Sequence, residues 1–75
     1  MKKEKINLSF GNKIRMLRED NGYNQYAFAF ECGISEAYYG RIERGEFSPS
    51  LKTIHKIARC LGITISDLLK DVDKI

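Results

Sequence analysis

The chain has 75 residues, a net charge of +3 at pH 7 and two cysteines. A chain of this length supports one small core, so we expect a single domain with no catalytic domain beside it. Cys32 and Cys60 fall at inward-facing helical positions far apart in the sequence, which predicts core thiols in a reducing compartment and no disulfide. His55 and the cysteines lack metal-ligand spacing, and no apolar run approaches the ~20 residues of a membrane span. We therefore expect a cytoplasmic protein with no metal, cofactor or membrane association.

The positive charge is concentrated near the amino terminus, where six basic residues and one acidic residue occupy the first eighteen positions. The segment after Ser66 is slightly acidic. Such an uneven distribution is typical of a surface that faces phosphate. Residues 1–8 alone read as a solvated basic tail. We expect the folded domain to span residues 9–71, followed by a short tail at 72–75.

An amphipathic pattern predicts the first helix over residues 10–21, with Ser9 as its N-cap. Its apolar stripe consists of Phe10, Ile14 and Leu17. Their spacing of four and three places them on one helical face, which should pack against the core.

Two short helices joined by a tight turn follow the first helix. Asn24 is placed to cap the first of them, residues 25–32, and Gly33 can adopt the positive φ that closes it. Ser35 is placed to cap the second, residues 36–44. Because only two residues separate the helices, the second must leave at a steep angle, which is the geometry of a helix-turn-helix. In such a unit the second helix can enter a major groove of DNA.

Several residue types occur at fixed offsets in and around these helices: Asn24-Gln25, Ala29, Gly33-Ile34-Ser35, Ile42-Glu43-Arg44-Gly45 and Ser48-Pro49-Ser50. Together they resemble the Cro/C1-type (XRE) family of DNA-binding domains over roughly residues 10–70. The resemblance implies a compact lambda-repressor-like fold and a transcriptional regulator. Phage repressors, antitoxins and controllers of restriction-modification genes are similarly compact, and size favours a repressor or a controller.

Two more helices complete the expected all-α domain. Ser50 is placed to cap a fourth helix that Gly62 ends, and its apolar residues recur at helical spacing. Thr64 and Asp67 resemble a capping box that opens a fifth helix, from Ile65 to about Asp71. Five helices and no strands are predicted.

DNA binding would divide between residues that hold phosphates and residues that read bases. The candidates for phosphate contact are Asn24, Gln25, Tyr38, Arg44 and Lys52. By the resemblance, base contacts fall at Glu36, Ala37 and Arg41. These side chains can accept from cytosine N4, touch a thymine methyl and pair with guanine O6 and N7, respectively.

Two of these assignments have simpler alternatives. Arg41 can be a solvated arginine that pairs with a nearby glutamate. Glu36 is favoured in a helix's first turn by the dipole even without DNA, and it can repel phosphate.

The resemblance also implies an ion pair between Arg18 and Glu43, which would lock the third helix against the first. One small domain offers few contacts, so we expect a homodimer on a palindromic site whose half-sites lie about 34 Å apart. The apolar residues available for a dimer interface recur along the C-terminal segment and are Ile65, Leu69, Val72 and Ile75.

Four residues depart from the family pattern, and one of them is Tyr39, which stands where a smaller aliphatic residue is common. Tyr26 and Phe30 lie one turn apart on the outer face of their helix, and we expect them to pack on each other and on the first helix. Gly40 interrupts the third helix, which we interpret as room for the backbone or for the bulky Tyr39.

If Tyr26 and Phe30 are exposed instead, the alternative is a module that binds a protein partner, as an antitoxin does. Enzymatic activity is not expected, because no motif joins Ser35, His55 and the cysteines.

Overall fold

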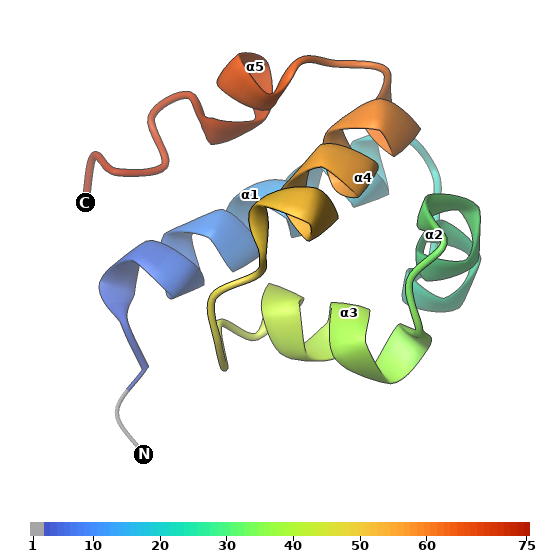
Figure 1. Ribbon diagram of the computed structural model, residues 1–75, viewed down its shortest axis with the longest axis horizontal. Helices are drawn as coiled ribbons and strands as arrows, with labels where there is room; N and C mark the ends of the chain where they lie inside the picture. The colour runs from blue at the N-terminus through green and yellow to red at the C-terminus, as the bar shows by residue number, and fades with distance from the viewer. Residues whose placement is uncertain (1–2) are drawn as a thin grey trace.

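A computed structural model describes residues 3–75, which form five α-helices and no strand. The helices are α1 (Lys5–Asp20), α2 (Gln25–Cys32), α3 (Glu36–Glu43), α4 (Leu51–Leu61) and α5 (Ile65–Leu69). In Figure 1, α1 and α4 cross the middle of the molecule, α3 lies along one edge and α5 along the opposite edge. The predicted all-α, five-helix architecture is therefore confirmed.

The core gathers large apolar side chains from all five helices. Those with less than 2% of their surface exposed are Ile14, Phe28, Tyr39, Ile42, Ile57 and Leu68. The rings of Phe28 and Tyr39 meet edge to face, with their centroids 5.3 Å apart. Ala29 is also buried, and its small side chain allows α2 to pack closely against its neighbours.

The helix starts predicted from capping residues are confirmed for α2 to α5. At each start a side-chain oxygen accepts a hydrogen bond from the backbone N–H three residues further on, at 2.8–3.2 Å, and these residues are Asn24, Ser35, Ser50 and Thr64. Gly33 and Gly62 end α2 and α4 with φ of +73° and +72°. The helix α5 ends at Leu69, two residues before the predicted end, because Asp71 has a φ of +64° that a right-handed helix does not allow.

The first helix begins earlier than predicted, at Lys5, so Ser9 is not its N-cap. The Ser9 hydroxyl lies inside α1 and donates to the Val72 carbonyl at 2.6 Å. The extra turn forms because it packs on distant parts of the chain: the Ser48 hydroxyl donates to the buried Asn7 side chain at 2.9 Å. Residues 5–8 are therefore part of the domain, as is the buried Val72, and the predicted tails are shorter. Residues 1 and 2 lie outside the described part of the chain.

Tyr26 and Phe30 do not pack as predicted. Their side chains are 66% and 68% exposed. The helix α2 packs mainly against α3 and α4, so α1 offers no flank to cover them. They form an exposed aromatic pair on the outer face of α2.

The two cysteines lie beside each other although 28 positions separate them. Both thiols are free, with Cys32 buried and Cys60 partly exposed. Burial, followed by the neighbouring Cys60 thiol, raises the pKa of the Cys32 thiol far above its ordinary value. Among residues 3–75, no helix is long and apolar enough to cross a bilayer, and no cluster of three or more potential metal ligands occurs.

Candidate nucleic-acid interface

The turn between α2 and α3 fixes the angle at which α3 leaves. Gly33 takes the left-handed conformation, and the Ile34 N–H donates to the Ala29 carbonyl at 2.9 Å. The core side of α3 then holds Tyr39, Ile42 and the buried Glu43. The opposite side of the helix faces outward as a result.

The outward side of α3 presents the three predicted base-contacting residues together. Glu36, Ala37 and Arg41 are all exposed. They line an open hollow of ≈ 390 Å³ with Gln25, Gly40 and Arg44. The structure thus brings the base-contacting candidates and two phosphate-contacting candidates to one surface.

The sequence suggested that Gly40 makes room for the backbone or for Tyr39, but in the structure the space beside Gly40 is occupied by neither. A Cβ built on Gly40 would stand 3.1 Å from Nη1 of Arg44 and 3.6 Å from Oε1 of Gln25. The space above this glycine is therefore taken by two polar side chains of the candidate interface.

Glu46 holds both arginines of this surface. Its carboxylate accepts a hydrogen bond from Arg44 Nε at 2.6 Å and lies 3.5 Å from Arg41 Nε. The hydrogen bond from Arg44 lowers the pKa of the Glu46 carboxyl, and the nearby charges of Arg44, Lys3 and Arg41 act in the same direction. In the absence of DNA, Arg41 is therefore a solvated arginine that pairs with a nearby glutamate, Glu46, as the alternative interpretation of Arg41 expected.

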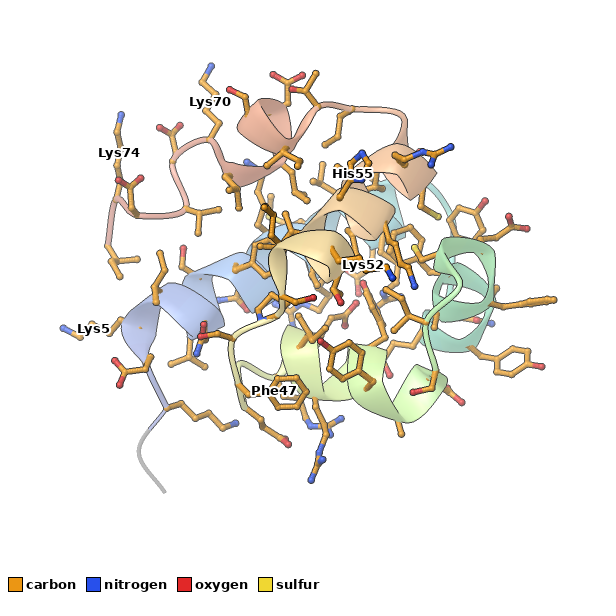
Figure 2. The ribbon with its side chains drawn as sticks, viewed as in Figure 1. Lys5, Phe47, Lys52, His55, Lys70 and Lys74 are labelled. Carbon is orange, nitrogen blue, oxygen red and sulfur yellow. The ribbon has the colours of Figure 1, made fainter. Side chains whose placement is uncertain are left out.

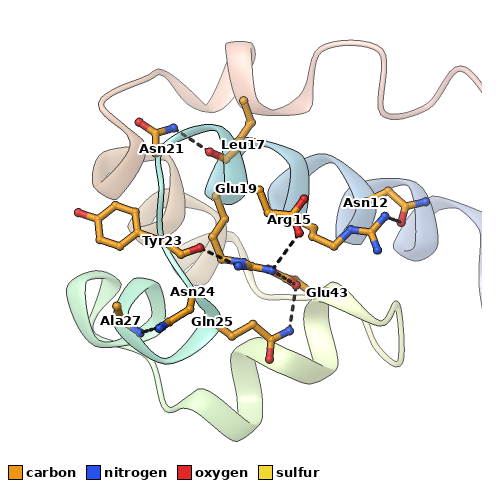
Figure 3. Close-up of polar contacts among 11 residues, drawn as sticks. Asn12, Arg15, Leu17, Glu19, Asn21, Tyr23, Asn24, Gln25, Ala27 and Glu43 are labelled. Atoms are coloured by element: carbon orange, nitrogen blue, oxygen red, sulfur yellow. Dashed lines mark hydrogen bonds and ion pairs between the residues drawn. The ribbon is translucent and has the colours of Figure 1, made fainter.

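The amino end of α2 is tied to α3 through Gln25. Its Nε2 donates to Glu43 Oε1 at 2.9 Å, as Figure 3 shows. The Asn24 side chain is used as the helix cap. These two side chains are thus partly occupied within the protein, which leaves the free backbone N–H groups of the first turn for an anion.

Arg18 and Glu43 form the ion pair that was expected to lock α3 against α1. Arg18 Nε donates to Glu43 Oε2 at 2.6 Å, Nη2 donates to Oε1 at 3.2 Å, and Nη1 donates to the Tyr23 carbonyl at 2.8 Å. Both side chains are more than 90% buried. Burial alone would raise the pKa of the Glu43 carboxyl, but the hydrogen bonds from Arg18 and Gln25 outweigh it and the net shift is downward.

Tyr38 lies where α3 approaches α4, and Lys52 borders a hollow between the end of α2 and α4. The Tyr38 ring stacks on Phe47, with centroids 5.2 Å apart, and its hydroxyl lies 3.3 Å from Thr53 Oγ1. Lys52 is exposed in the first turn of α4, and Figure 2 shows Phe47 beside α3. The Tyr38 hydroxyl therefore has a partner within the protein, while Lys52 faces solvent.

The predicted interface residues at the C-terminal end divide into two groups. Ile65 and Val72 pack in the protein's own core, whereas Leu69 and Ile75 are 36% and 70% exposed. Leu69 borders a groove of ≈ 470 Å³ whose other apolar residues are Ile6, Phe10, Pro49, Ile54 and Val72.

Two features of the candidate surfaces were missed by sequence reasoning. Glu46 was not singled out, because its contacts with Arg41 and Arg44 depend on the turn after α3. Ile6 was assigned to a solvated tail, since nothing local shows that α1 begins at Lys5.

Comparison with known proteins gives consistent matches to regulators of one family. A helix-turn-helix family model (HTH_3) matches residues 14–68. The control protein C.MunI of Mycoplasma sp. is 40% identical over 70 residues, covering 92% of this chain and 95% of that protein.

Two solved structures of controllers or regulators share the fold. The restriction-modification controller protein C.AhdI from Aeromonas hydrophila has a TM-score of 0.79 and 37% identity, covering 83% of this chain and 94% of that chain. The biofilm master regulator SinR, solved in complex with DNA, has a TM-score of 0.76 and 27% identity, covering 81% and 98%. The chain therefore belongs to the Cro/C1-type (XRE) family of helix-turn-helix proteins.

Proposed function

We propose that the protein is a sequence-specific regulator of transcription that binds double-stranded DNA as a homodimer, with α3 in the major groove. The observation that carries this proposal is the exposed row of Glu36, Ala37 and Arg41 on a helix whose inner side is fixed by Glu43. A recognition helix needs free side chains on one face and a rigid attachment on the other, because loosely held contacts discriminate poorly between bases.

The phosphate contacts would set the register of α3 in the groove. Backbone N–H groups at the amino end of α2, beside Asn24 and Gln25, favour a phosphate oxygen through hydrogen bonding and the helix dipole. Arg44 at the end of α3 and Lys52 in the first turn of α4 add positive charge on either side of α3.

The proposed dimer surface is the groove between the start of α1, α4 and the C-terminal segment. Ile6, Ile54 and Leu69 border this groove, and Leu51 lies one turn before Ile54 on the same side of α4 with 70% of its surface exposed. A second copy packed here would bury these apolar side chains and relate two recognition helices by a two-fold axis. Such a dimer requires a palindromic site, with half-sites about 34 Å apart.

A controller of restriction-modification genes is the regulator type that we favour. C.AhdI carries that description, and this chain covers 94% of its length and 95% of the control protein C.MunI. The match thus extends over nearly whole controllers and is not confined to a DNA-binding portion of a larger regulator.

The proposal is tested by selecting bound duplexes from a random pool at two salt concentrations and sequencing those retained. We expect an enriched palindrome, and an affinity that falls steeply as salt rises because phosphate contacts release counterions. The mass of the complex on the enriched duplex should correspond to two protein chains. No enrichment at either salt would contradict sequence-specific binding and would turn attention to the exposed pair Tyr26 and Phe30.

A further inference from the structure

The turn after α3 places Glu46 with little freedom. The Gly45 N–H donates to the Ile42 carbonyl at 3.0 Å and the Glu46 N–H donates to the Arg41 carbonyl at 3.0 Å. These two bonds form a Schellman motif, and Gly45 has the positive φ of +72° that this motif requires. The backbone of Glu46 is therefore fixed beside the last turn of α3, and from there its carboxylate reaches both Arg41 and Arg44.

Both arginines approach the Glu46 carboxylate through their Nε atoms. Arg44 donates through Nε at 2.6 Å, and the Nε of Arg41 lies 3.5 Å away. A guanidinium group carries five donors in a fixed plane. When the Nε edge is held by a carboxylate, the two terminal nitrogens remain at the far end of the group.

Gly40 determines where that far end of Arg44 lies. Nη1 of Arg44 is 3.1 Å from the position of a Cβ on residue 40, so the guanidinium rests over the glycine backbone inside the hollow of α3. A Cβ at position 40 would require the guanidinium to shift by a few tenths of an ångström. Glu46 and Gly40 thus define the arginine position from opposite sides.

We propose that Glu46 is a positioning residue for DNA recognition: it accepts a hydrogen bond from Arg44 Nε and forms an ion pair with Arg41 Nε, so that the terminal nitrogens of Arg41 are presented to a base and those of Arg44 to the DNA backbone. This inference rests on the proposed function. A carboxylate on a DNA-facing surface repels phosphate, so it weakens binding to every duplex. Its benefit is discrimination, because a pre-ordered arginine pairs with one base geometry and loses little side-chain freedom on binding.

The test compares Glu46→Ala with the wild-type protein on the selected operator and on a random duplex of equal length, at two salt concentrations. Loss of the carboxylate should tighten binding to the random duplex, while the ratio of operator to random affinity falls about tenfold. Gly40→Ala shifts Arg44, the proposed phosphate contact, and not Arg41, so it should change the two affinities by a similar factor without changing the net charge. Glu46→Gln should lower the ratio less than Glu46→Ala does, since its amide oxygen can still accept from Nε.

Glu31→Ala is the matched control, because it removes an exposed carboxylate from α2 that touches neither arginine. It should change both affinities by the same factor. If Glu46→Ala also changes both by one factor, Glu46 acts only as a charge and the positioning role is overturned while the proposed function stands. If the wild-type protein itself prefers no duplex, the proposed function and the role of Glu46 both fall.

A measurement without DNA tests the geometry directly. In the free protein, the Arg44 Nε–H proton should exchange slowly with water and give a distinct NMR signal, because Glu46 accepts its hydrogen bond. In Glu46→Ala this signal should broaden, whereas that of the exposed Arg15 should not change. Equal exchange of the Arg44 Nε–H in both proteins would overturn the positioning role.

Discussion

Arg18 and Glu43 lie 25 positions apart in the sequence, yet their side chains meet at 2.6 Å in the interior between α1 and α3. Gln25 donates to the same carboxylate, so one buried glutamate connects the first, second and third helices. The orientation of the proposed recognition helix therefore depends on a polar cluster as well as on apolar packing.

Removal of one partner of this pair should destabilise the protein strongly. We expect Arg18→Met to lower the free energy of unfolding by about 3–5 kcal/mol, because it leaves the Glu43 charge buried without its main partner. The double variant Arg18→Met with Glu43→Leu should recover part of that loss, since two apolar side chains can replace a buried pair. Urea unfolding of the single and double variants measures the coupling.

Arg15→Met is the control for this comparison, because Arg15 is exposed on the same helix. It should change stability by no more than about 0.5 kcal/mol. If the losses in free energy of unfolding caused by Arg18→Met and Glu43→Leu simply add in the double variant, the two side chains do not interact and the prediction is wrong.

The same cluster predicts how stability depends on pH. The pKa of Glu43 is lowered in the folded protein, so its contribution is fully present above the ordinary glutamate pKa of about 4.3 and is lost as pH falls through the lower folded-state value. We expect the free energy of unfolding to fall as pH is lowered from about 5 to about 3.

Glu43→Gln should flatten this part of the pH curve. Glu46→Gln should flatten it much less, because Glu46 is exposed and solvent screens its ion pairs. Urea unfolding at several pH values measures both effects. If the free energy of unfolding falls equally with pH in the wild type and in Glu43→Gln, Glu43 is not the source of the pH dependence.

Gly11 is the closest approach between α1 and α3. A Cβ on this residue would clash with the Glu43 carbonyl oxygen and would lie 2.8 Å from that of Ile42. Alanine is favoured over glycine in a helix by about 1 kcal/mol, yet we expect Gly11→Ala to destabilise by about 1–3 kcal/mol or more because backbone atoms must separate. Asn12→Ala, at the next and exposed position, should have little effect. Thermal unfolding distinguishes the two, and a wild-type midpoint for Gly11→Ala would contradict the close approach.

Local signals in the sequence were sufficient for the starts of α2 to α5. Asn24 and Ser35, for example, cap helices through bonds that span only three residues, so their chemistry can be read from neighbouring positions. The start of α1 was predicted wrongly because it depends on the bond between Ser48 and Asn7, which joins residues 41 positions apart.

The candidate site shows the same division between local and distant information. The family resemblance and the local helix-turn-helix pattern were sufficient to expect Glu36, Ala37 and Arg41 on the outward side of α3, where the structure has them exposed. Exposure of Tyr26 and Phe30 was not predicted, because it depends on which helices pack around α2. The backbone of Glu46 is placed by the Schellman motif after α3, which is local in sequence, but the contacts of its side chain with Arg41 and Arg44 depend on side-chain positions that helical spacing does not give.

Tyr39 carries a buried hydroxyl that no hydrogen-bond partner satisfies among the described residues, although it lies near Glu43 and Arg18. Burial raises the pKa of this hydroxyl well above its ordinary value. Tyr39→Phe should therefore leave stability unchanged or raise it by up to about 1 kcal/mol, since an unpaired hydroxyl is costly to bury. Tyr39→Ala should cost about 3–5 kcal/mol through loss of packing. A large loss in Tyr39→Phe, measured by urea unfolding, would mean that the hydroxyl has a partner in solution.

Arg41 and Arg44 should respond differently when DNA binding is measured. If Arg41 pairs with a base, Arg41→Ala should lose about 1–3 kcal/mol on the selected operator and relax the preference at one base pair. Arg44→Ala should weaken operator and random duplexes to a similar degree and reduce the salt slope by about one, as expected for a phosphate contact.

Both arginines contact Glu46 and both substitutions remove one positive charge, so each serves as the charge control for the other. Fluorescence anisotropy titrations with operator duplexes altered at single base pairs separate the two effects. If Arg41→Ala weakens the operator and a random duplex equally, Arg41 contacts only the backbone. Base reading by α3 would then have to come from Glu36 and Ala37, the two remaining exposed residues at its amino end.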